Sequence, residues 1–486
     1  MQARDWTGAL RRIDQALSIE PKDPKSLVYR AQCLAALARA REACEAAGEA
    51  LRTAPPDPVV LDAIGGVFSH ANDQDSALAA FDRAVALAPR NARFIFNRAT
   101  VYRFLGRIRE AEADYDRVIA LEPNDHEAYL NRSELRTQSA HMNHIGALEA
   151  LLARGVADWR GEVQIRYAIA KEYEDTGDHE KSFQQLEAGA KKRRAHLQYD
   201  VAADVATVDW IIEAFPGTPA HDPSAAEHEC GDAPLDSPIF IVGLPRSGST
   251  LLDRILGSHS AVHCAGELNH FALSVVDAVR RGSGAAPLTR RELVARSADV
   301  DFAALGRDYL VRVPPAPAGA RRFTDKMPLN YLYCGLIRRA LPNAKIVHVV
   351  RQPMAVCYAM YKTLFKDGYP FSYDLGDIAR YYIAYRRLMD HWNSSMPGAI
   401  LTLSYEALVE DQLGRTRQLL DFCGLEWQDA CAEFHLNSAP ATTASAVQVR
   451  QRLYHTSVAQ WRQYAAHLAP LNERLRAAGV ATDWPA

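Results

Sequence analysis

The sequence predicts an α-helical solenoid of repeats followed by an α/β domain with a central parallel sheet. Prolines recur every 34 residues in the first part of the chain, the composition changes near residue 235, and an apolar strand then runs into a glycine-bearing turn. The predicted domains are a repeat solenoid over 1–196, a helix and linker over 197–235, and the α/β domain over 236–486.

Size and composition limit the class of protein. The chain has 486 residues, which suits two or three domains, and its net charge of −3 gives no reason to expect nucleic acid as a partner. It has no apolar leader core and no run of ~18 apolar residues, which predicts a cytoplasmic protein without a membrane span. The eight cysteines form no Cys-x-x-Cys pair, so we expect reduced thiols and no zinc site.

The repeats are columns of residues in register. A proline marks where one helix stops, because proline cannot continue a helix. Small residues let two helices cross closely, and larger residues fill the space between them. The columns are Pro21, Pro55, Pro89 and Pro123; Ala9, Ala43, Ala77 and Ala111; Ile13, Ala47, Phe81 and Tyr115; Ala16, Ala50, Ala84 and Val118; and Ala31, Gly65 and Ala99.

These columns resemble the tetratricopeptide (TPR) repeat over about residues 1–140, and a degenerate unit is expected at 163–196. A generic helical bundle with fortuitous prolines is the alternative. The chain opens in the second half of a repeat, so either the first helix of that repeat is missing or Met1 is not the natural start. Such repeats stack into a solenoid with a concave groove, which predicts a protein or peptide partner there.

The junction between the domains has its own composition. Residues 205–215 predict one more helix, and residues 216–234 are rich in Pro, Gly, Ala and Asp without a hydrophobic period. That composition predicts a linker, which ends where a short apolar strand begins at Pro238.

The strand 238–243 leads into the turn 244–250 and then an amphipathic helix. A strand, a glycine-bearing turn and a helix aim backbone N–H groups at an anion. Gly243 and Gly248 have the spacing of the nucleotide-triphosphate loop, but Ser249 stands where that loop has its lysine. The turn is therefore P-loop-like, and the missing lysine argues against a Mg-dependent kinase or triphosphatase. A purely structural turn is the alternative.

A second strand, 344–350, ends at Arg351. Its apolar core predicts a buried parallel strand. An arginine at the carboxyl end of such a strand is placed where α/β sheets bind ligands, although a surface ion pair is the alternative.

The two segments together resemble the 3′-phosphoadenosine 5′-phosphosulfate (PAPS)-dependent sulfotransferases. IVGLPRSGSTLLDRIL resembles their 5′-phosphosulfate loop, and IVHVVRQPMAVCYAM resembles their 3′-phosphate segment. Within that superfamily the likeness is greatest to tyrosylprotein sulfotransferases and bacterial TPR-linked sulfotransferases. Four further matches follow in order: CAGEL, FTDKMPLNY, LSYEALVED and TASAVQVRQRLYHTSVAQW.

The resemblance implies PAPS as the sulfuryl donor and a role for each matching residue. Glu267 is implied as the catalytic base, with Lys326 and Ser445 stabilising the transferring group. The stretch from Arg246 to Thr250 binds the 5′-phosphosulfate, Arg351 binds the 3′-phosphate, Tyr405 lies beside the adenine, and 445–454 closes over the donor. The implied donor-binding residues are Arg246, Ser247, Gly248, Ser249, Thr250, Arg351, Tyr405, Ser445, Arg450 and Tyr454.

Three positions depart from the family pattern. Ala359 replaces a serine and Ala355 an acidic residue after Arg351, and Gln460 replaces a lysine of the tyrosylprotein enzymes. Each change removes a donor or an orienting contact, which Lys362, Thr363 or Arg450 could replace.

The chemistry agrees with these residue types. Sulfuryl transfer must position two oxygens and stabilise spread negative charge, as phosphoryl transfer does. A carboxylate such as Glu267 can take the proton of the acceptor hydroxyl, and Lys326 and Arg246 can supply positive charge. The alternatives are a capping or salt-bridging Glu267 and an exposed Lys326. We expect no metal, because no His/Asp/Glu cluster has ligand spacing, and we expect His263, His348 and His435 to be core or surface residues.

The predicted function is therefore sulfuryl transfer from PAPS to a hydroxyl. Protein tyrosine is favoured as the acceptor, and a carbohydrate or small-molecule hydroxyl stays open. Two rival functions are a nucleotide phosphotransferase, which Ser249 argues against, and a scaffold with a decayed enzyme domain, which Ala359 favours.

Overall fold

The computed structural model describes residues 5–37, 39–53, 55–217, 237–282, 287–314, 316–317, 319–366, 368–440, 448–453 and 456–483. They form two compact units. The first contains the chain up to Thr176 with two short later segments, Arg312–Pro315 and Ser438–Arg450, and the second contains most of the chain from Gly177 onward. We call them the repeat unit and the sheet unit.

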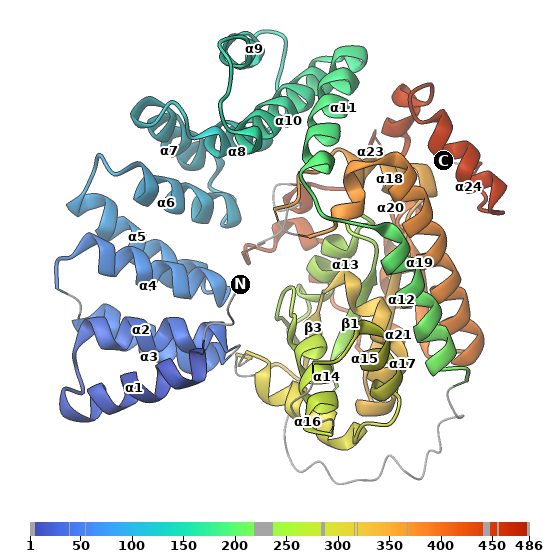
Figure 1. Ribbon diagram of the computed structural model, residues 1–486, viewed down its shortest axis with the longest axis horizontal. Helices are drawn as coiled ribbons and strands as arrows, with labels where there is room; N and C mark the ends of the chain where they lie inside the picture. Colours follow the sequence, from blue (N-terminus) through green and yellow to red (C-terminus); the bar gives the residue numbers. More distant parts are fainter. Residues whose placement is uncertain are drawn as a thin grey trace. The chain divides into compact units, whose positions relative to one another are not determined.

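The repeat unit is built from antiparallel helix pairs, which Figure 1 shows in blue and teal. All four prolines of the predicted column lie between helices, each at the start of a new repeat. The helices are α1 (Trp6–Ile19), α2 (Pro24–Ala36), α3 (Ala40–Thr53), α4 (Pro58–His70), α5 (Gln74–Leu87), α6 (Ala92–Phe104), α7 (Ile108–Leu121), α8 (His126–Glu134), α9 (Ile145–Ala153) and α10 (Trp159–Thr176).

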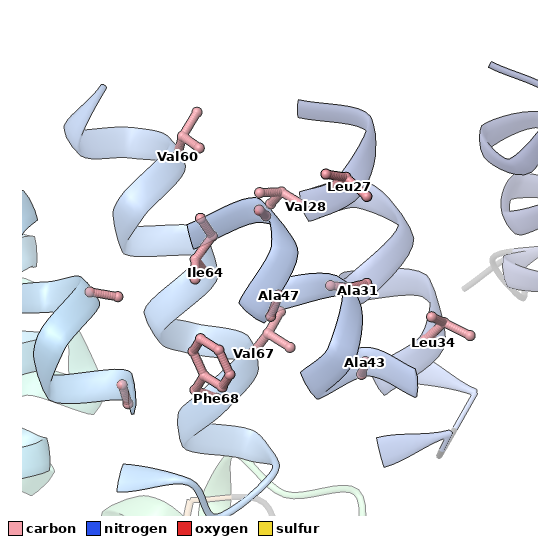
Figure 2. Packing of buried hydrophobic residues seen from close by; sticks show 14 of the residues in the cluster. Leu27, Val28, Ala31, Leu34, Ala43, Ala47, Val60, Ile64, Val67 and Phe68 are labelled. Carbon is pink, nitrogen blue, oxygen red and sulfur yellow. The ribbon is translucent and has the colours of Figure 1, made fainter. Parts of the chain in front are cut away.

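The small-residue columns lie where helices cross. Figure 2 shows Ala31 and Ala43 among the larger side chains of α2 and α4. At Gly65 a Cβ atom would lie 2.7 Å from the Phe81 ring, so α4 and α5 approach too closely there for any side chain. The prediction that small residues lie where two helices cross closely is thereby confirmed.

A further column caps the first helix of each pair. Asp23, Asp57, Asn91 and Asp125 are 34 residues apart, and each side chain accepts a hydrogen bond from a backbone N–H in the first turn of the next helix. Each cap satisfies a donor that the helix itself leaves unpaired, which is worth about 1 kcal/mol. The capping hydrogen bonds of the repeats therefore recur with the same 34-residue period as the packing of their helices.

The period ends after α8. The buried Glu172 of α10 accepts a 2.5 Å hydrogen bond from the Ser133 hydroxyl and another of 2.5 Å from the His144 backbone N–H. Asp175, one turn later, accepts a 2.7 Å bond from the Gln138 backbone N–H. Helix α10 therefore holds the irregular loop 135–144, which has no counterpart in the preceding repeats.

Within the described residues, the sheet unit has five parallel strands in the order β2-β3-β1-β4-β5. The strands are β2 (Val262–Cys264), β3 (Arg322–Asp325), β1 (Ile239–Gly243), β4 (Lys345–Val350) and β5 (Ile400–Ser404). β1 is central and fully buried, as its apolar sequence predicts. The predicted fold class, a helical repeat region followed by an α/β domain with a central parallel sheet, is confirmed.

Helices cover the sheet and complete this unit. The remaining elements are α11 (His179–Ala195), α12 (Val201–Ala214), α13 (Ser249–Leu256), α14 (His270–Arg281), α15 (Arg290–Ser297), α16 (Phe302–Arg312), η2 (Pro328–Tyr333), α17 (Cys334–Ala340), α18 (Pro353–Tyr361), η3 (Pro370–Tyr373), α19 (Leu375–Ser395), α20 (Tyr405–Glu410), α21 (Gln412–Cys423), α22 (Asp429–Ala432), η4 (Phe434–Leu436), α23 (Thr456–Ala459), η6 (Gln460–Tyr464) and α24 (Ala469–Ala477).

Helix α11 belongs to the sheet unit by its contacts, although its sequence fits the repeat columns. The Arg194 guanidinium donates 2.9 Å hydrogen bonds to the Asp377 carboxylate and the Tyr199 carbonyl. The domain bounds drawn from the sequence stay a prediction. Among the described helices, none is long and apolar enough to cross a membrane.

Candidate active site

The turn between β1 and α13 is held in an uncommon backbone conformation. Gly243, Arg246 and Gly248 have φ angles of +149°, +67° and +108°. A Cβ atom at Gly243 would lie 2.5 Å from the Val349 carbonyl oxygen, so only glycine fits beside β4. The chain thus wraps around the N-terminus of α13, where unpaired N–H groups attract anions.

Hydroxyl groups line this turn. Ser247 is only 1% exposed, and its Oγ has no hydrogen-bond partner among the described residues. Buried polar atoms are nearly always paired, so a lone hydroxyl inside an anion-binding turn indicates a place for a ligand oxygen. Ser249 is also buried, and Thr250 lies in the first turn of α13. The side chains of the predicted 5′ loop therefore lie together.

Arg351 reaches the same turn from the end of β4. Its Nη1 donates a 3.0 Å hydrogen bond to the Arg246 carbonyl oxygen, and its guanidinium lies 4.9 Å from the centre of the Tyr405 ring. Tyr405 in turn packs on the turn, since a Cβ atom at Gly248 would lie 2.6 Å from its ring. The parallel pairing of β1 with β4 and of β4 with β5 brings these three residues to one edge of the sheet.

Glu267 and Lys326 form an ion pair on the other side of β1. The Lys326 ammonium lies 2.5 Å from a carboxylate oxygen of Glu267. The lysine side chain is 1% exposed and the glutamate side chain 43% exposed, so the carboxylate faces solvent while the ammonium is enclosed. Lys326 directly follows β3, which pairs with β1, and its backbone N–H donates a 2.9 Å hydrogen bond to the Gly266 carbonyl. The pair therefore lies at the same carboxyl edge as the anion-binding turn.

Sequence reasoning missed a buried carboxyl next to this pair. Asp325 is fully buried at the end of β3 and accepts a 2.9 Å hydrogen bond from the Tyr309 hydroxyl. Burial raises the pKa of Asp325 to about 7, against the opposing effect of its hydrogen bonds and of Lys326. The only signal in the sequence was an acidic residue inside an otherwise buried strand.

The C-terminal part of the predicted set is partly outside the described residues. Ser445 and Tyr454 lie there, so their predicted roles stay predictions. Arg450, in η5 (Gln448–Arg450), donates hydrogen bonds to the carbonyls of Phe104 (2.9 Å) and Ala439 (3.1 Å), all within the repeat unit. A Cβ atom at Gly106 would lie 2.5 Å from its Nε. The structure therefore shows Arg450 bonded to protein carbonyls, and its phosphate contact remains a prediction.

The structure also shows what surrounds the three residues that depart from the family pattern. Ala359 and Ala355 are buried in α18, and the Thr363 hydroxyl donates to the Ala359 carbonyl at 2.8 Å. Lys362 donates a 3.1 Å hydrogen bond to the Gln460 side chain. Two of the side chains that could replace the lost contacts thus have protein partners in this structure.

The histidines differ in their surroundings. His348 is fully buried in β4 and bonds to the Tyr385 hydroxyl, and burial lowers its pKa to about 3. Burial also lowers the pKa of His263. No group of three or more metal-ligating side chains occurs within the described ranges.

Comparison with known proteins agrees with this architecture. Residues 238–429 match the model of the sulfotransferase family, and residues 92–125 match a tetratricopeptide repeat. Residues 238–429 therefore form a sulfotransferase-family domain, which a tetratricopeptide repeat precedes.

Individual relatives cover different parts of the chain. An uncharacterised protein of Aquifex aeolicus is 32% identical over 72% of this chain, and this chain spans about half (46%) of that protein's length. A putative protein-tyrosine sulfotransferase of Caenorhabditis briggsae is 24% identical over 40% of this chain and 69% of that protein. Among solved structures, the sulfotransferase domain of the Synechococcus PCC 7002 olefin synthase is 20% identical, with a TM-score of 0.35, over 52% of this chain and 98% of that domain.

Proposed function

We propose that this protein transfers a sulfuryl group from PAPS to an acceptor hydroxyl, with protein tyrosine as the acceptor. The observation that carries the proposal is the positive-φ turn 243–250 with its lone buried Ser247 hydroxyl, beside the Glu267–Lys326 pair. The turn suits the 5′ end of the donor, and the pair suits the chemistry at its sulfur.

The donor would be held along one edge of the sheet. Arg246 to Thr250 would bind the 5′-phosphosulfate through backbone N–H groups and hydroxyls. Arg351 would bind the 3′-phosphate, because a guanidinium forms paired hydrogen bonds to phosphate oxygens. Tyr405 would lie beside the adenine, and Ser445, Arg450 and Tyr454 would close over the donor.

The reaction is a displacement at sulfur. The acceptor oxygen forms a bond to sulfur while the bond between sulfur and the phosphate oxygen breaks, and the electron pair stays on that phosphate oxygen. The Glu267 carboxylate, which is solvent-facing, would take the acceptor proton. Lys326 and Arg246 would supply positive charge for the leaving oxygen, since fixed charges in an enclosed site are worth more than in water. Lys326 also orients the Glu267 carboxylate through the ion pair.

The acceptor rests on weaker support. Relatives in Caenorhabditis briggsae and Drosophila melanogaster carry the name protein-tyrosine sulfotransferase, at 24% and 25% identity. Tetratricopeptide repeats commonly present a concave surface for binding, so a protein substrate or partner in that groove is part of the proposal. A carbohydrate or small-molecule hydroxyl is the second candidate acceptor.

Two alternative functions have less support. A phosphotransferase would need a cation at the position of Ser249, which is a buried serine. A scaffold with a decayed enzyme domain would have no reason to keep the Glu267–Lys326 pair.

A thermal shift with 3′-phosphoadenosine 5′-phosphate, run beside Mg-ATP, tests the proposal. A ligand at ~100 times its dissociation constant stabilises the native state by about 2.7 kcal/mol. We expect stabilisation by the bisphosphate alone. Stabilisation only by Mg-ATP would favour the phosphotransferase, and no shift with either ligand would favour the scaffold.

A further inference from the structure

One bulky residue near the candidate site has a backbone conformation that side chains disfavour. Only three non-glycine residues among those described have positive φ: Asn72, Arg246 and Tyr369. Asparagine tolerates this region, and Arg246 belongs to the anion-binding turn. Tyr369, with φ +54° and ψ +52°, has neither reason. Such a conformation is unfavourable for a residue with a Cβ atom and persists only where surrounding contacts enforce it.

The loop that carries Tyr369 is fixed from both sides. The Tyr373 hydroxyl donates a 2.8 Å hydrogen bond to the Phe365 carbonyl, which closes the loop. From α11, the Arg193 guanidinium donates a 2.6 Å bond to the Lys366 carbonyl and lies 5.7 Å from the Tyr373 ring centre. These contacts hold the strained residue in place.

A continuous run of aromatic rings connects Tyr369 with the segment after Lys326. The Tyr369 ring lies 4.7 Å from Phe365 and 6.1 Å from Phe371, edge to face in both pairs. Phe371 is stacked on Tyr381 at 3.6 Å, and Tyr381 accepts a 2.7 Å hydrogen bond from the Tyr331 hydroxyl. Tyr331 belongs to η2, which begins two residues after Lys326. A series of packed side chains thus connects Tyr369 with the segment that follows Lys326.

The surroundings of the Tyr369 hydroxyl include negative charge from the candidate site. Burial raises the pKa of the Tyr369 hydroxyl, and the negative charge of Glu267 raises it further. This electrostatic effect requires the two groups to be near one another. The Tyr369 side chain is half-buried, as is that of Phe365, so both retain exposed ring surface.

We propose that Tyr369, with Phe365, forms the acceptor-side wall of the site and packs against the ring of a phenolic acceptor whose hydroxyl points to Glu267. This inference rests on the proposed function and narrows its acceptor to an aromatic hydroxyl. Aromatic rings pair in offset or edge-to-face geometry, and a fixed ring supplies that contact at low entropic cost. A sugar would need several polar side chains, whereas Phe365 and Tyr369 offer mainly ring surface.

The positive φ of Tyr369 allows its ring to be removed without disturbing the backbone. Tyr369→Gly removes the ring at a φ angle that glycine adopts freely, so the fold should be kept. We expect the KM for a tyrosine peptide to rise at least ~10-fold, on the order of the loss of one aromatic contact in a binding site. The bisphosphate thermal shift should not change. Tyr369→Phe should retain most of the affinity, and Asn72→Gly, the same backbone change in the repeat unit, should leave KM as it was.

The result that overturns the inference is an unchanged KM for the tyrosine peptide in Tyr369→Gly. An equal rise in KM for a sugar acceptor would also overturn the assignment to aromatic hydroxyls.

Failure of the proposed function can be separated from failure of this inference. If the natural chain transfers sulfate to no acceptor, binding of a tyrosine peptide to the bisphosphate-loaded protein is measured by calorimetry instead. Weaker binding of the tyrosine peptide by Tyr369→Gly than by the natural chain supports the proposed contact between Tyr369 and the acceptor ring. Equal binding by both, or no binding by the natural chain, overturns it.

Discussion

The repeat unit and the sheet unit use the same local devices for different ends. At Gly65 and at Gly243, a missing Cβ atom allows close approach of another part of the chain. In the repeat unit that approach only packs one helix on its neighbour. A small residue recurs there every 34 residues, as Ala31 and Ala99, and each repeat has its own cap. In the sheet unit the approach shapes a single turn that meets residues at the ends of two other strands, β4 and β5. The difference teaches that periodic contacts build the scaffold, whereas the site depends on contacts that occur once.

Glu267→Gln tests the ion pair between Glu267 and Lys326 in the sheet unit. The amide keeps the shape of the side chain but cannot take a proton, so we expect the turnover rate to fall by roughly 10²–10⁴. The measurement is steady-state transfer to a tyrosine peptide, with the bisphosphate thermal shift as control. Loss of the bisphosphate shift would instead make Glu267 a structural residue.

Asp325→Asn tests the pH dependence that a buried carboxyl gives to the stability of the sheet unit. The pKa of Asp325 in the folded protein, about 7, lies above the ordinary aspartate value of 3.8, so the folded state holds a proton that the unfolded state has lost between those pH values. The stability from this neutral carboxyl is present below pH ~4 and declines by up to about 1.4 kcal/mol per pH unit as the pH rises towards 7. The Asn variant keeps an acceptor for Tyr309 without the titration, so its melting temperature should vary less with pH. Parallel pH profiles of the two proteins would contradict the buried-carboxyl account.

Gly65→Ala and Gly66→Ala form a matched pair inside the repeat unit. An alanine at Gly65 meets the Phe81 ring, which should destabilise the protein by about 1–3 kcal/mol through overpacking. An alanine at Gly66 meets no atom within 4 Å and should stabilise the helix by roughly 0.5–1 kcal/mol. Thermal unfolding measures both changes, and the bisphosphate shift should persist in each. If both substitutions had the same sign, close helix crossing would not explain Gly65.

Most of the repeat unit and the core of the anion site could be predicted from the sequence, because their signals are local. The columns have a fixed period, and the strand, turn and helix of 238–256 are continuous in the chain. β2 has three residues and β3 has four, which is too short to carry a periodic signal, and their pairing is set by tertiary contacts.

Contacts between distant residues were harder to predict. The ion pair between Glu267 and Lys326, 59 residues apart, needed the family resemblance rather than spacing. Nothing in the sequence marks the positive φ of Tyr369, because the contacts that enforce it come from α11 and from Tyr373. Asp325 gave only a weak signal, since one acidic residue in a strand has many explanations.

The capping residues of the repeat unit have a consequence for how such a chain can change in length. Because Asp23, Asp57, Asn91 and Asp125 share one 34-residue register, an in-frame duplication of 57–90 would carry its own cap and its own close-packed glycine. Each new unit would also meet neighbours of the same kind. After α8 the chain no longer has repeating contacts of this kind, since Glu172 and Asp175 bind one irregular segment, Ser133 and the loop 135–144. Adding or removing a whole 34-residue unit upstream of α8 would therefore preserve contacts of this kind, whereas Glu172 and Asp175 constrain the length of the loop 135–144.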